Sequence, residues 1–282
     1  MTSYAFRQVD VFSKLPFKGN PLAVVLGSDR LTDRQMADIA SWTNLSETTF
    51  LLRPQHPAAD YRVRIFTPER ELPFAGHPTL GSCHAWLAAG NVPRGEEIVQ
   101  ECGVGLVRVR RDGNRLAFAA PPLRRSGEVA PGLLADIAHS LQINPGRISA
   151  SQWVDNGPGW VAVMLGTRAE VLAIERGRIA LPPQAPALGV VAPWASDRDG
   201  SEAQFEVRAF FGTPTVEDPV TGSLNASLAL WLIGAGLAPG AYVASQGTAL
   251  GRAGRVHVAR IGADTWIGGE TTTCIEGQIE VW

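Results

Sequence analysis

Hydrophobic and polar residues alternate along many short stretches of this chain, and alternation with a period of two predicts β-strands. Three longer stretches, with apolar residues three or four positions apart, predict helices at 32–43, 132–141 and 168–174. Two more apolar helices are expected at 80–89 and 223–233, each opened by a Gly-Ser pair. The predicted strands are 5–12, 22–26, 61–66, 105–110, 115–119, 160–165, 205–211, 254–261 and 265–268. Strands therefore dominate an α+β architecture in which each half of the chain wraps a sheet around one buried helix.

The chain resembles itself at about half its length. Residues 77–87 align with 218–228 at an offset of 141, with Pro, Gly, Ser, Ala and Leu in common. Two shorter stretches follow in the same order: 63–66 aligns with 207–210 at an offset of 144, and 23–27 aligns with 162–166 at 139. The alternative is coincidence among common residues. Three matches in one order favour two copies of one unit, with a boundary near 120–127.

Composition excludes several classes of protein. The 25 basic and 27 acidic residues give a net charge of −2, without the basic excess typical of nucleic-acid binding. Three widely spaced cysteines and no C-x-x-C indicate a reducing compartment, no disulfide framework and no structural zinc. The uncharged stretch 228–244 is broken by Gly and Pro, which favours a buried helix and its C-terminal stop over a membrane span. The N-terminus lacks a signal-peptide pattern, so a cytoplasmic protein is expected.

The paired Gly-Ser motifs are the first candidate chemistry. A helix N-terminus carries unpaired N–H groups and partial positive charge, so two such termini facing each other would hold a small anion. Ser82 and Ser223 then either cap their helices or donate a hydroxyl to the ligand. The plainer interpretation is that each Gly-Ser pair only ends a strand and begins a helix.

Three ionisable residues are candidates for proton transfer. His77 and Asp218 occupy the first position of the repeated motif, so facing motifs would pair an imidazole with a carboxylate. Glu47 lies among Ser and Thr between Leu45 and Phe50, as expected of a carboxylate entering a polar pocket. The alternatives are a hydrogen-bonded turn histidine, a turn aspartate and a surface glutamate.

Taken together, six motifs resemble the PhzF family, the phenazine-biosynthesis isomerase-like proteins related to diaminopimelate epimerase. The motifs are Val9-Asp-Val-Phe12, Gly19-Asn-Pro21, Asn44-Leu-Ser-Glu-Thr48, Phe66-Thr-Pro68, Gly76-His77 with Thr79, and Glu217-Asp-Pro-Val-Thr-Gly-Ser223. The resemblance implies an α+β fold of two similar lobes, each a β-barrel-like sheet around a central helix, with the active site between them. The expected lobes are 1–122, completed by about 270–282, and 123–269.

The resemblance also implies a chemistry that needs no metal and no cofactor. In the family's phenazine enzyme a proton moves along the ring of a dihydro-hydroxyanthranilate. Glu47 would be the proton-shuttling acid/base, and His77 and Asp218 would hold or polarise the substrate. The small carboxylate substrate would be bound by Gly76, Gly222 and Ser223, with Asn20 and Ser82 as further contacts. A homodimer is implied as well, and neither nucleic acid nor a membrane is expected as a partner.

One departure from related enzymes narrows the choice. Related epimerases and racemases use two facing cysteines, whereas Cys83 here falls inside a predicted apolar helix, where a thiol is inert. Three functions stay open: a proton-shift isomerase, an epimerase of an amino or hydroxy acid that uses Glu47 with His77 or Asp218, and a carboxylate-binding protein without turnover. The segment 151–159 has no recognised motif and is a candidate for lining the pocket.

Overall fold

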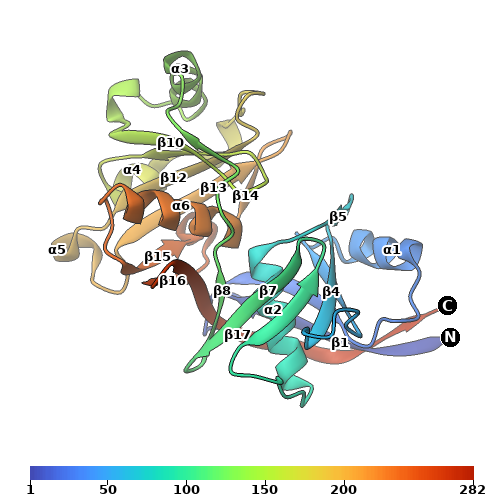
Figure 1. Cartoon of the computed structure of the whole chain (residues 1–282). Coiled ribbons are helices and arrows are strands. Elements are labelled where there is room, and N and C mark those ends of the chain that lie inside the picture. The colour runs from blue at the N-terminus through green and yellow to red at the C-terminus, as the bar shows by residue number, and fades with distance from the viewer. The chain divides into compact units, whose positions relative to one another are not determined.

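The computed structural model describes all residues from 1 to 282 (Figure 1). Contacts divide the chain into two compact units. The first unit consists of Met1–Ala119 and Gly268–Trp282, and the second is Ala120–Ile267. Both mix strands with a few helices, as expected of an α+β protein.

The first unit is a mixed sheet whose strand pairings form a closed succession. Neighbours pair in the order β8, β7, β6, β4, β3, β2, β1 and β17, and β17 pairs again with β8. The short β5 pairs with β4 as a hairpin. The strands are β1 (Thr2–Val11), β2 (Asn20–Val25), β3 (Thr48–Leu52), β4 (Tyr61–Phe66), β5 (Glu71–Leu72), β6 (Ile98–Cys102), β7 (Gly105–Asp112), β8 (Arg115–Ala119) and β17 (Asp264–Val281).

Two helices pack on this sheet. The amphipathic α1 (Asp33–Thr43) is capped by Thr32 and covers a cluster that includes Tyr4, Val25 and Phe50. The other helix, α2 (Gly76–Ala88), is apolar around its whole circumference, as buried helices are, and nine of its 13 residues are buried. Gly81 allows its close approach to the sheet, because a Cβ there would lie 2.5 Å from the Leu22 side chain.

The second unit repeats the pairing pattern of the first. β10–β11 is antiparallel, β11–β12 parallel, β12–β13 antiparallel, β13–β15 parallel and β15–β16 antiparallel, the same alternation as β1–β2–β3–β4–β6–β7. β14 forms a hairpin with β13 as β5 does with β4, and β9 adds to β10. The strands are β9 (Arg125–Gly127), β10 (Ala150–Asp155), β11 (Trp160–Met164), β12 (Ala187–Pro193), β13 (Phe205–Phe211), β14 (Val216–Asp218), β15 (Ala241–Gln246) and β16 (Gly254–Ile261).

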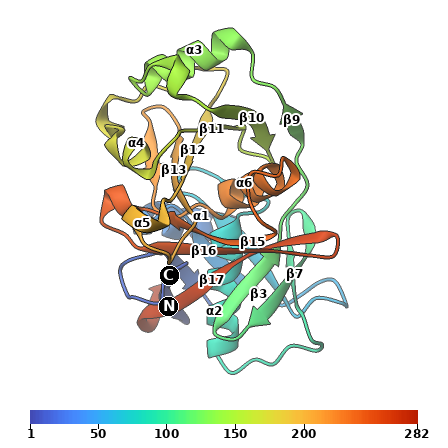
Figure 2. The same cartoon turned by 90° about the vertical axis from the view of Figure 1, so that its left-hand side faces the viewer.

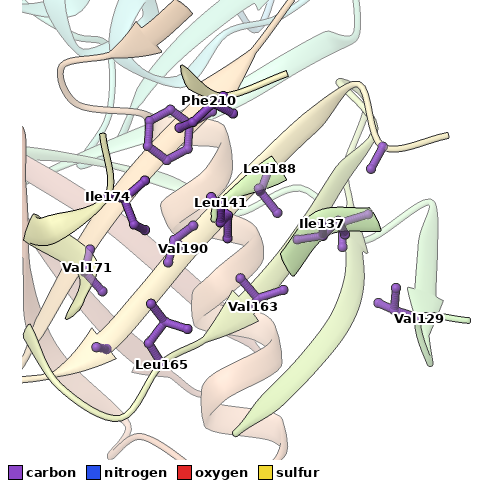
Figure 3. Close-up of a cluster of buried hydrophobic side chains, with 14 of the residues drawn as sticks. Val129, Ile137, Leu141, Val163, Leu165, Val171, Ile174, Leu188, Val190 and Phe210 are labelled. Carbon is purple, nitrogen blue, oxygen red and sulfur yellow. The ribbon is translucent and has the colours of Figure 1, made fainter. Parts of the chain in front are cut away.

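The core of the second unit lies on both faces of its sheet. On one face, α3 and α4 cover the cluster drawn in Figure 3, which includes Ile137, Val163, Leu188 and Val190. Gly189 points to the other face, where its missing Cβ leaves room for the Leu224 side chain of the apolar α6. Figure 2 shows α6 beside this sheet. The helices are α3 (Pro131–Ser140), α4 (Arg168–Ala173), α5 (Ser196–Asp199) and α6 (Gly222–Gly234), with single 3₁₀ turns η1 (Pro145–Arg147), η2 (Arg176–Arg178) and η3 (Thr248–Leu250).

The structure corrects the predicted start of one central helix. The Gly-Ser pair does open α6, but α2 begins at Gly76, four residues before the predicted Leu80. The prediction began the helix after Pro78, whereas Pro78 lies in its first turn. Proline is compatible with the first turn of a helix, because no N–H is required there. The predicted helix and stop at 228–244 also contains the start of β15.

Eight strands have no counterpart among the predictions: β3, β6, β10, β12 and β15, and the short β5, β9 and β14. Four of the predicted strands, 61–66, 115–119, 205–211 and 254–261, match the observed bounds. None of the observed helices has both the length and the apolar character that crossing a membrane requires.

Candidate active site

The loop before β2 places the first site residue, Asn20. Asp10 is buried at the end of β1, and its Oδ2 accepts the N–H groups of Lys18 and Gly19, both at 2.7 Å. Gly19 is required because a Cβ would lie 2.1 Å from the Val11 carbonyl oxygen. Asn20 is therefore fully buried at the start of β2, and its Nδ2 lies 3.5 Å from Nδ1 of His77.

Glu47 is positioned by the turn that leaves α1. Asn44 ends the helix in the left-handed conformation with φ 53°, which suits asparagine. Glu47 lies next to β3, and the adjacent Thr48 shares a 2.8 Å hydrogen bond with Thr43 across the turn. The Glu47 side chain is 14% exposed, so its carboxylate is not the surface group that the plainer interpretation described.

His77 lies in the first turn of α2 and faces Glu47. Its side chain is 5% exposed, and its Nε2 lies 3.4 Å from Oε2 of Glu47. Burial lowers the pKa of His77 to about 3, although a hydrogen bond with the backbone of Pro21 acts in the opposite direction. The imidazole is therefore neutral near pH 7, so this contact is not an ion pair.

The N-terminus of α2 is held by a buried polar chain. No side chain caps this terminus, and Pro78 carries no N–H, so the N–H groups of Gly76 and His77 have no intrahelical acceptor. Thr79 donates to the Ala75 carbonyl at 2.9 Å, and Gln100 donates to the Thr79 hydroxyl at 3.0 Å. The first turn is thus fixed from behind.

Ser82 does not lie at this terminus, so the prediction that it caps the helix or contacts a ligand was wrong. It is fully buried in the middle of α2 and donates to the Thr49 hydroxyl at 2.9 Å. The predicted alignment of residues 77–87 with 218–228, at an offset of 141, was also wrong. Both central helices have 13 residues, and aligning their starts pairs His77 with Ser223, at an offset of 146, and not with Asp218.

Asp218 ends β14, four residues before α6. It is 9% exposed, and its Oδ2 accepts the Thr221 hydroxyl at 2.6 Å. The preceding Glu217 pairs with both Nε and Nη2 of the buried Arg208, each at 2.8 Å. Arg208 also donates to the carbonyls of Val171 and Ile174, which anchors the β13–β14 hairpin that carries Asp218.

The N-terminus of α6 supplies the last predicted residues. Like that of α2, it has no side-chain cap, so the N–H groups of Gly222 and Ser223 have no intrahelical acceptor. Asn156 donates to the Ser223 carbonyl at 2.9 Å, and Trp160 Nε1 donates to the Ser223 hydroxyl oxygen at 3.2 Å. A hydroxyl that accepts from Trp160 keeps its own proton for another acceptor.

Several residues that support the site were missed by sequence reasoning. Trp160 is predicted only as the first residue of strand 160–165, and Asn156 lies in the segment 151–159, which has no recognised motif. Thr221 and Gln246 were not considered at all. The available signal was weak: Thr221 stands inside the Glu217–Ser223 motif, and Gln246 is a polar residue at the end of a largely apolar stretch, after Ser245.

The structure thus assembles two groups of site residues. Asn20, Glu47 and His77 meet in the first unit. Asp218, Gly222 and Ser223 lie around the start of α6 in the second. No three His, Cys, Asp or Glu side chains gather in a way that would hold a metal ion.

Comparison with known proteins assigns the family. A model of the phenazine biosynthesis-like proteins, PhzC-PhzF, matches residues 9–277. Antisense-enhancing sequence 1 of Schizosaccharomyces pombe is 35% identical over 306 aligned positions that cover 99% of both chains. The trans-2,3-dihydro-3-hydroxyanthranilate isomerase of Pseudomonas aeruginosa is 43% identical over 112 residues, 39% of each chain.

The fold agrees with that assignment. The crystal structure of a PhzF-family protein of Enterococcus faecalis superposes with a TM-score of 0.81 and 25% identity, covering 99% of this chain and 100% of that one. Family match, sequence relatives and fold point the same way: the chain belongs to the PhzC-PhzF family of phenazine biosynthesis-like proteins and is an isomerase-type enzyme.

Proposed function

We propose that this enzyme is a cofactor-independent isomerase that shifts a proton on a small unsaturated carboxylate, with Glu47 as the acid/base. The observation that carries the proposal is the contact of 3.4 Å between the Glu47 carboxylate and the neutral imidazole of His77. A carboxylate beside a neutral imidazole takes up a proton without creating a second charge, as a shuttle requires.

The proposed reaction has two proton steps. Glu47 removes a proton from a carbon next to the unsaturated system, which leaves an anion delocalised over the substrate. The resulting carboxylic acid then returns the proton to another carbon of the same system. His77 faces Glu47 in both states and stays neutral throughout, because burial opposes its protonation.

The substrate carboxylate and the developing anion need electrostatic stabilisation. The N–H groups of Gly222 and Ser223 begin α6, where the helix dipole favours negative charge, and the Ser223 hydroxyl retains its proton for donation. Gly76 and the His77 N–H supply the same property in the first unit. We propose that Asp218 takes part in the same catalytic cycle by orienting a polar group of the substrate.

Solvent deuterium exchange tests this function. The enzyme is incubated in D₂O with trans-2,3-dihydro-3-hydroxyanthranilate, the compound named for the Pseudomonas aeruginosa relative, and with a panel of small amino and hydroxy acids. Deuterium is expected at one carbon with wild type and with Glu96→Gln, an exposed control in the same unit. Glu47→Gln is expected to abolish exchange. Exchange that persists in Glu47→Gln would remove Glu47 from its role.

Epimerisation is the second candidate, and stereochemical analysis of the product separates it from isomerisation. The two-cysteine route gains no support, because Cys83 is fully buried and its pKa is raised to about 12 by that burial. The epimerase proposed as the alternative would use Glu47 with His77 or Asp218. Ligand binding without any exchange would favour the third function, a binding protein without turnover.

The matching strand pairings and the two uncapped 13-residue helices also support an internal duplication, two copies of one barrel-like unit with limits near 1–122 and 123–269. The proposed homodimer rests on the family resemblance alone, and sedimentation equilibrium tests it: a single species of 30.1 kDa would contradict it.

A further inference from the structure

A buried glutamine connects the strand β15 with the carboxylate of Asp218. Gln246 is 1% exposed, and its amide contacts lie in the turn that precedes α6 and in the first turn of α6 itself. Its Oε1 accepts the Thr221 N–H at 3.0 Å and Asn225 Nδ2 at 2.8 Å. Its Nε2 donates to the Asp218 carbonyl at 3.1 Å and to the Thr221 hydroxyl oxygen at 2.9 Å.

These contacts fix the direction of each hydrogen bond that links Gln246 through Thr221 to Asp218. Oε1 faces two donors, so the amide cannot be flipped without placing its NH₂ group against an N–H and another NH₂ group. The Thr221 hydroxyl receives a proton from Nε2, so its own single proton must point elsewhere. The acceptor is Oδ2 of Asp218, at 2.6 Å.

We propose that Gln246 is a positioning residue for Asp218, acting through the Thr221 hydroxyl, which it turns onto the carboxylate. The proposal rests on the function proposed above, in which Asp218 orients the substrate. A hydroxyl donated to a carboxylate is a short, charge-assisted hydrogen bond, and it leaves Oδ1 in a defined direction. Gln246 contacts no reacting atom and works only through Thr221.

The first unit contains an equivalent set of hydrogen bonds, but without a carboxylate at its end. Gln100 donates to Thr79, and Thr79 donates to the carbonyl of Ala75, the residue before α2. In the second unit Asn225 donates to the carbonyl of Thr221, the residue before α6. The pairs Ala75 and Thr221, Thr79 and Asn225, and Gln100 and Gln246 are all separated by 146 positions.

The difference between the units separates support from positioning. In both, a buried glutamine braces the first turn of the central helix. In the first unit the other end of the glutamine accepts the Tyr61 hydroxyl at 3.0 Å. Only in the second unit does the glutamine donate to a hydroxyl, that of Thr221, which itself donates to a carboxylate, that of Asp218. The hydrogen bond to a carboxylate is therefore not required for the glutamine to brace the helix.

The backbone around Gln246 leaves it little freedom. A Cβ at Gly254 would lie 2.4 Å from the Val220 side chain, and one at Gly247 would lie 2.6 Å from the Pro219 carbonyl oxygen. The turn that follows Asp218 therefore packs directly on β15 and β16. Gln246 and Thr221 are held in fixed geometry by this contact.

The test compares variants that change one proton. Thr221→Val removes the hydroxyl and keeps the shape, whereas Thr221→Ser keeps the hydroxyl. Gln246→Glu keeps Thr221 but replaces the donating NH₂ by an oxygen, which accepts the hydroxyl proton and turns it away from Asp218. Thr32→Val is the matched control, because it removes the hydroxyl that caps α1 and bonds to Gln35.

We expect Thr221→Val and Gln246→Glu to lower kcat/KM at least tenfold through kcat, with Thr221→Ser within threefold of wild type and Thr32→Val unchanged. Equal losses in Thr221→Val and Thr221→Ser, or activity within threefold of wild type in Thr221→Val, would overturn the proposal. Gln246→Glu buries a new charge, so if it does not fold, the two Thr221 variants decide.

A second readout does not depend on the reaction. Crystal structures of wild type, Thr221→Ser and Thr221→Val are compared at the Asp218 side chain. We expect a single carboxylate orientation in the first two and a rotated or split one in Thr221→Val. An unchanged orientation in Thr221→Val would overturn the positioning role even if no substrate is turned over, while absent turnover by wild type with the expected orientations would count against the proposed function alone.

Discussion

Oε2 of Glu47 lies 3.4 Å from Nε2 of His77, and the imidazole in this contact is neutral. The geometry alone describes an ion pair, but the lowered pKa of His77 excludes a charged imidazole near pH 7. The contact is therefore not an ion pair. This relationship determines how the site responds to pH and which variants are informative.

His77 is expected to make the protein less stable in mild acid. Its pKa is about 3 in the folded protein, while the unfolded chain takes up the proton near pH ~6.5. The unfolded state thus binds more protons between these values, and the free energy of unfolding falls as the pH falls through that window. From pH 7 to pH 5 this one group is expected to cost about 2 kcal/mol.

Urea unfolding at pH 7 and at pH 5 measures this cost. His77→Gln removes the titrating group, so its loss of stability between the two pH values is expected to be smaller than that of wild type by the same amount. His84 also has a lowered pKa and contributes equally to both proteins. An identical pH dependence in the two proteins would show that burial does not lower the pKa of His77.

Gly81→Ala is expected to destabilise the first unit by about 1–3 kcal/mol, because its Cβ would overpack the contact between α2 and the sheet. The added atom would lie 2.5 Å from Leu22 Cδ2 and 3.0 Å from Val11 Cγ2. Gly132→Ala is the control: this glycine in α3 has nothing within 4 Å of the added atom. It is expected to stabilise the protein by about 0.5–1 kcal/mol. Thermal unfolding of the two variants would contradict this account if both shifted in the same direction.

Arg208→Met is expected to cost about 3–5 kcal/mol, because it leaves a buried carboxylate without its partner. The Arg208 and Glu217 side chains are 2% and 1% exposed. The equivalent pair on the β4–β5 hairpin, Arg64 with Glu71, is 18% and 41% exposed, so Arg64→Met is expected to cost only about 1 kcal/mol. Denaturant unfolding at pH 7 compares them, and similar losses would mean that burial does not govern these pairs.

Cys83 is expected to be chemically inert in the folded enzyme. Burial raises the pKa of its thiol to about 12, whereas Cys102 and Cys274 are partly exposed. Iodoacetamide at pH 8 should therefore label Cys102 and Cys274 first and reach Cys83 only after denaturation, as peptide mass spectrometry will show. Cys83→Ala should retain proton exchange. If Cys83→Ala lost exchange without losing stability, that result would support a cysteine mechanism.

The sequence by itself determined the elements whose signals are local. The first five residues of 61–66 and of 205–211 alternate between apolar and polar, and both predicted strands match the observed bounds. The Glu217–Ser223 motif predicted the start of α6. Six short motifs indicated the family, and each of them is a run of neighbouring residues. These features are recoverable because backbone period, turn chemistry and motif spacing are properties of neighbouring residues.

Tertiary structure decided the rest. β12 is a nearly uniform apolar run, and β3 consists of two threonines followed by three apolar residues. No alternation marks either segment, and pairing with distant strands makes them strands. The start of α2 moved to Gly76, because Gly81 and Ser82 are packing residues of a helix pressed against β1 and β2. With that start, His77 aligns in the repeat with Ser223 and not with Asp218.

The protonation of the site is likewise a tertiary property. The sequence names Glu47 and His77 but not their contact, since 30 positions separate them and a loop fixed by Asp10 brings Asn20 beside them. His77 is neutral because the surrounding atoms exclude water from it. The Thr221 hydroxyl, which donates to Asp218, is directed by Gln246, 28 positions away from Asp218. Desolvation and hydrogen-bond direction depend on the three-dimensional surroundings of a group, which no local pattern encodes.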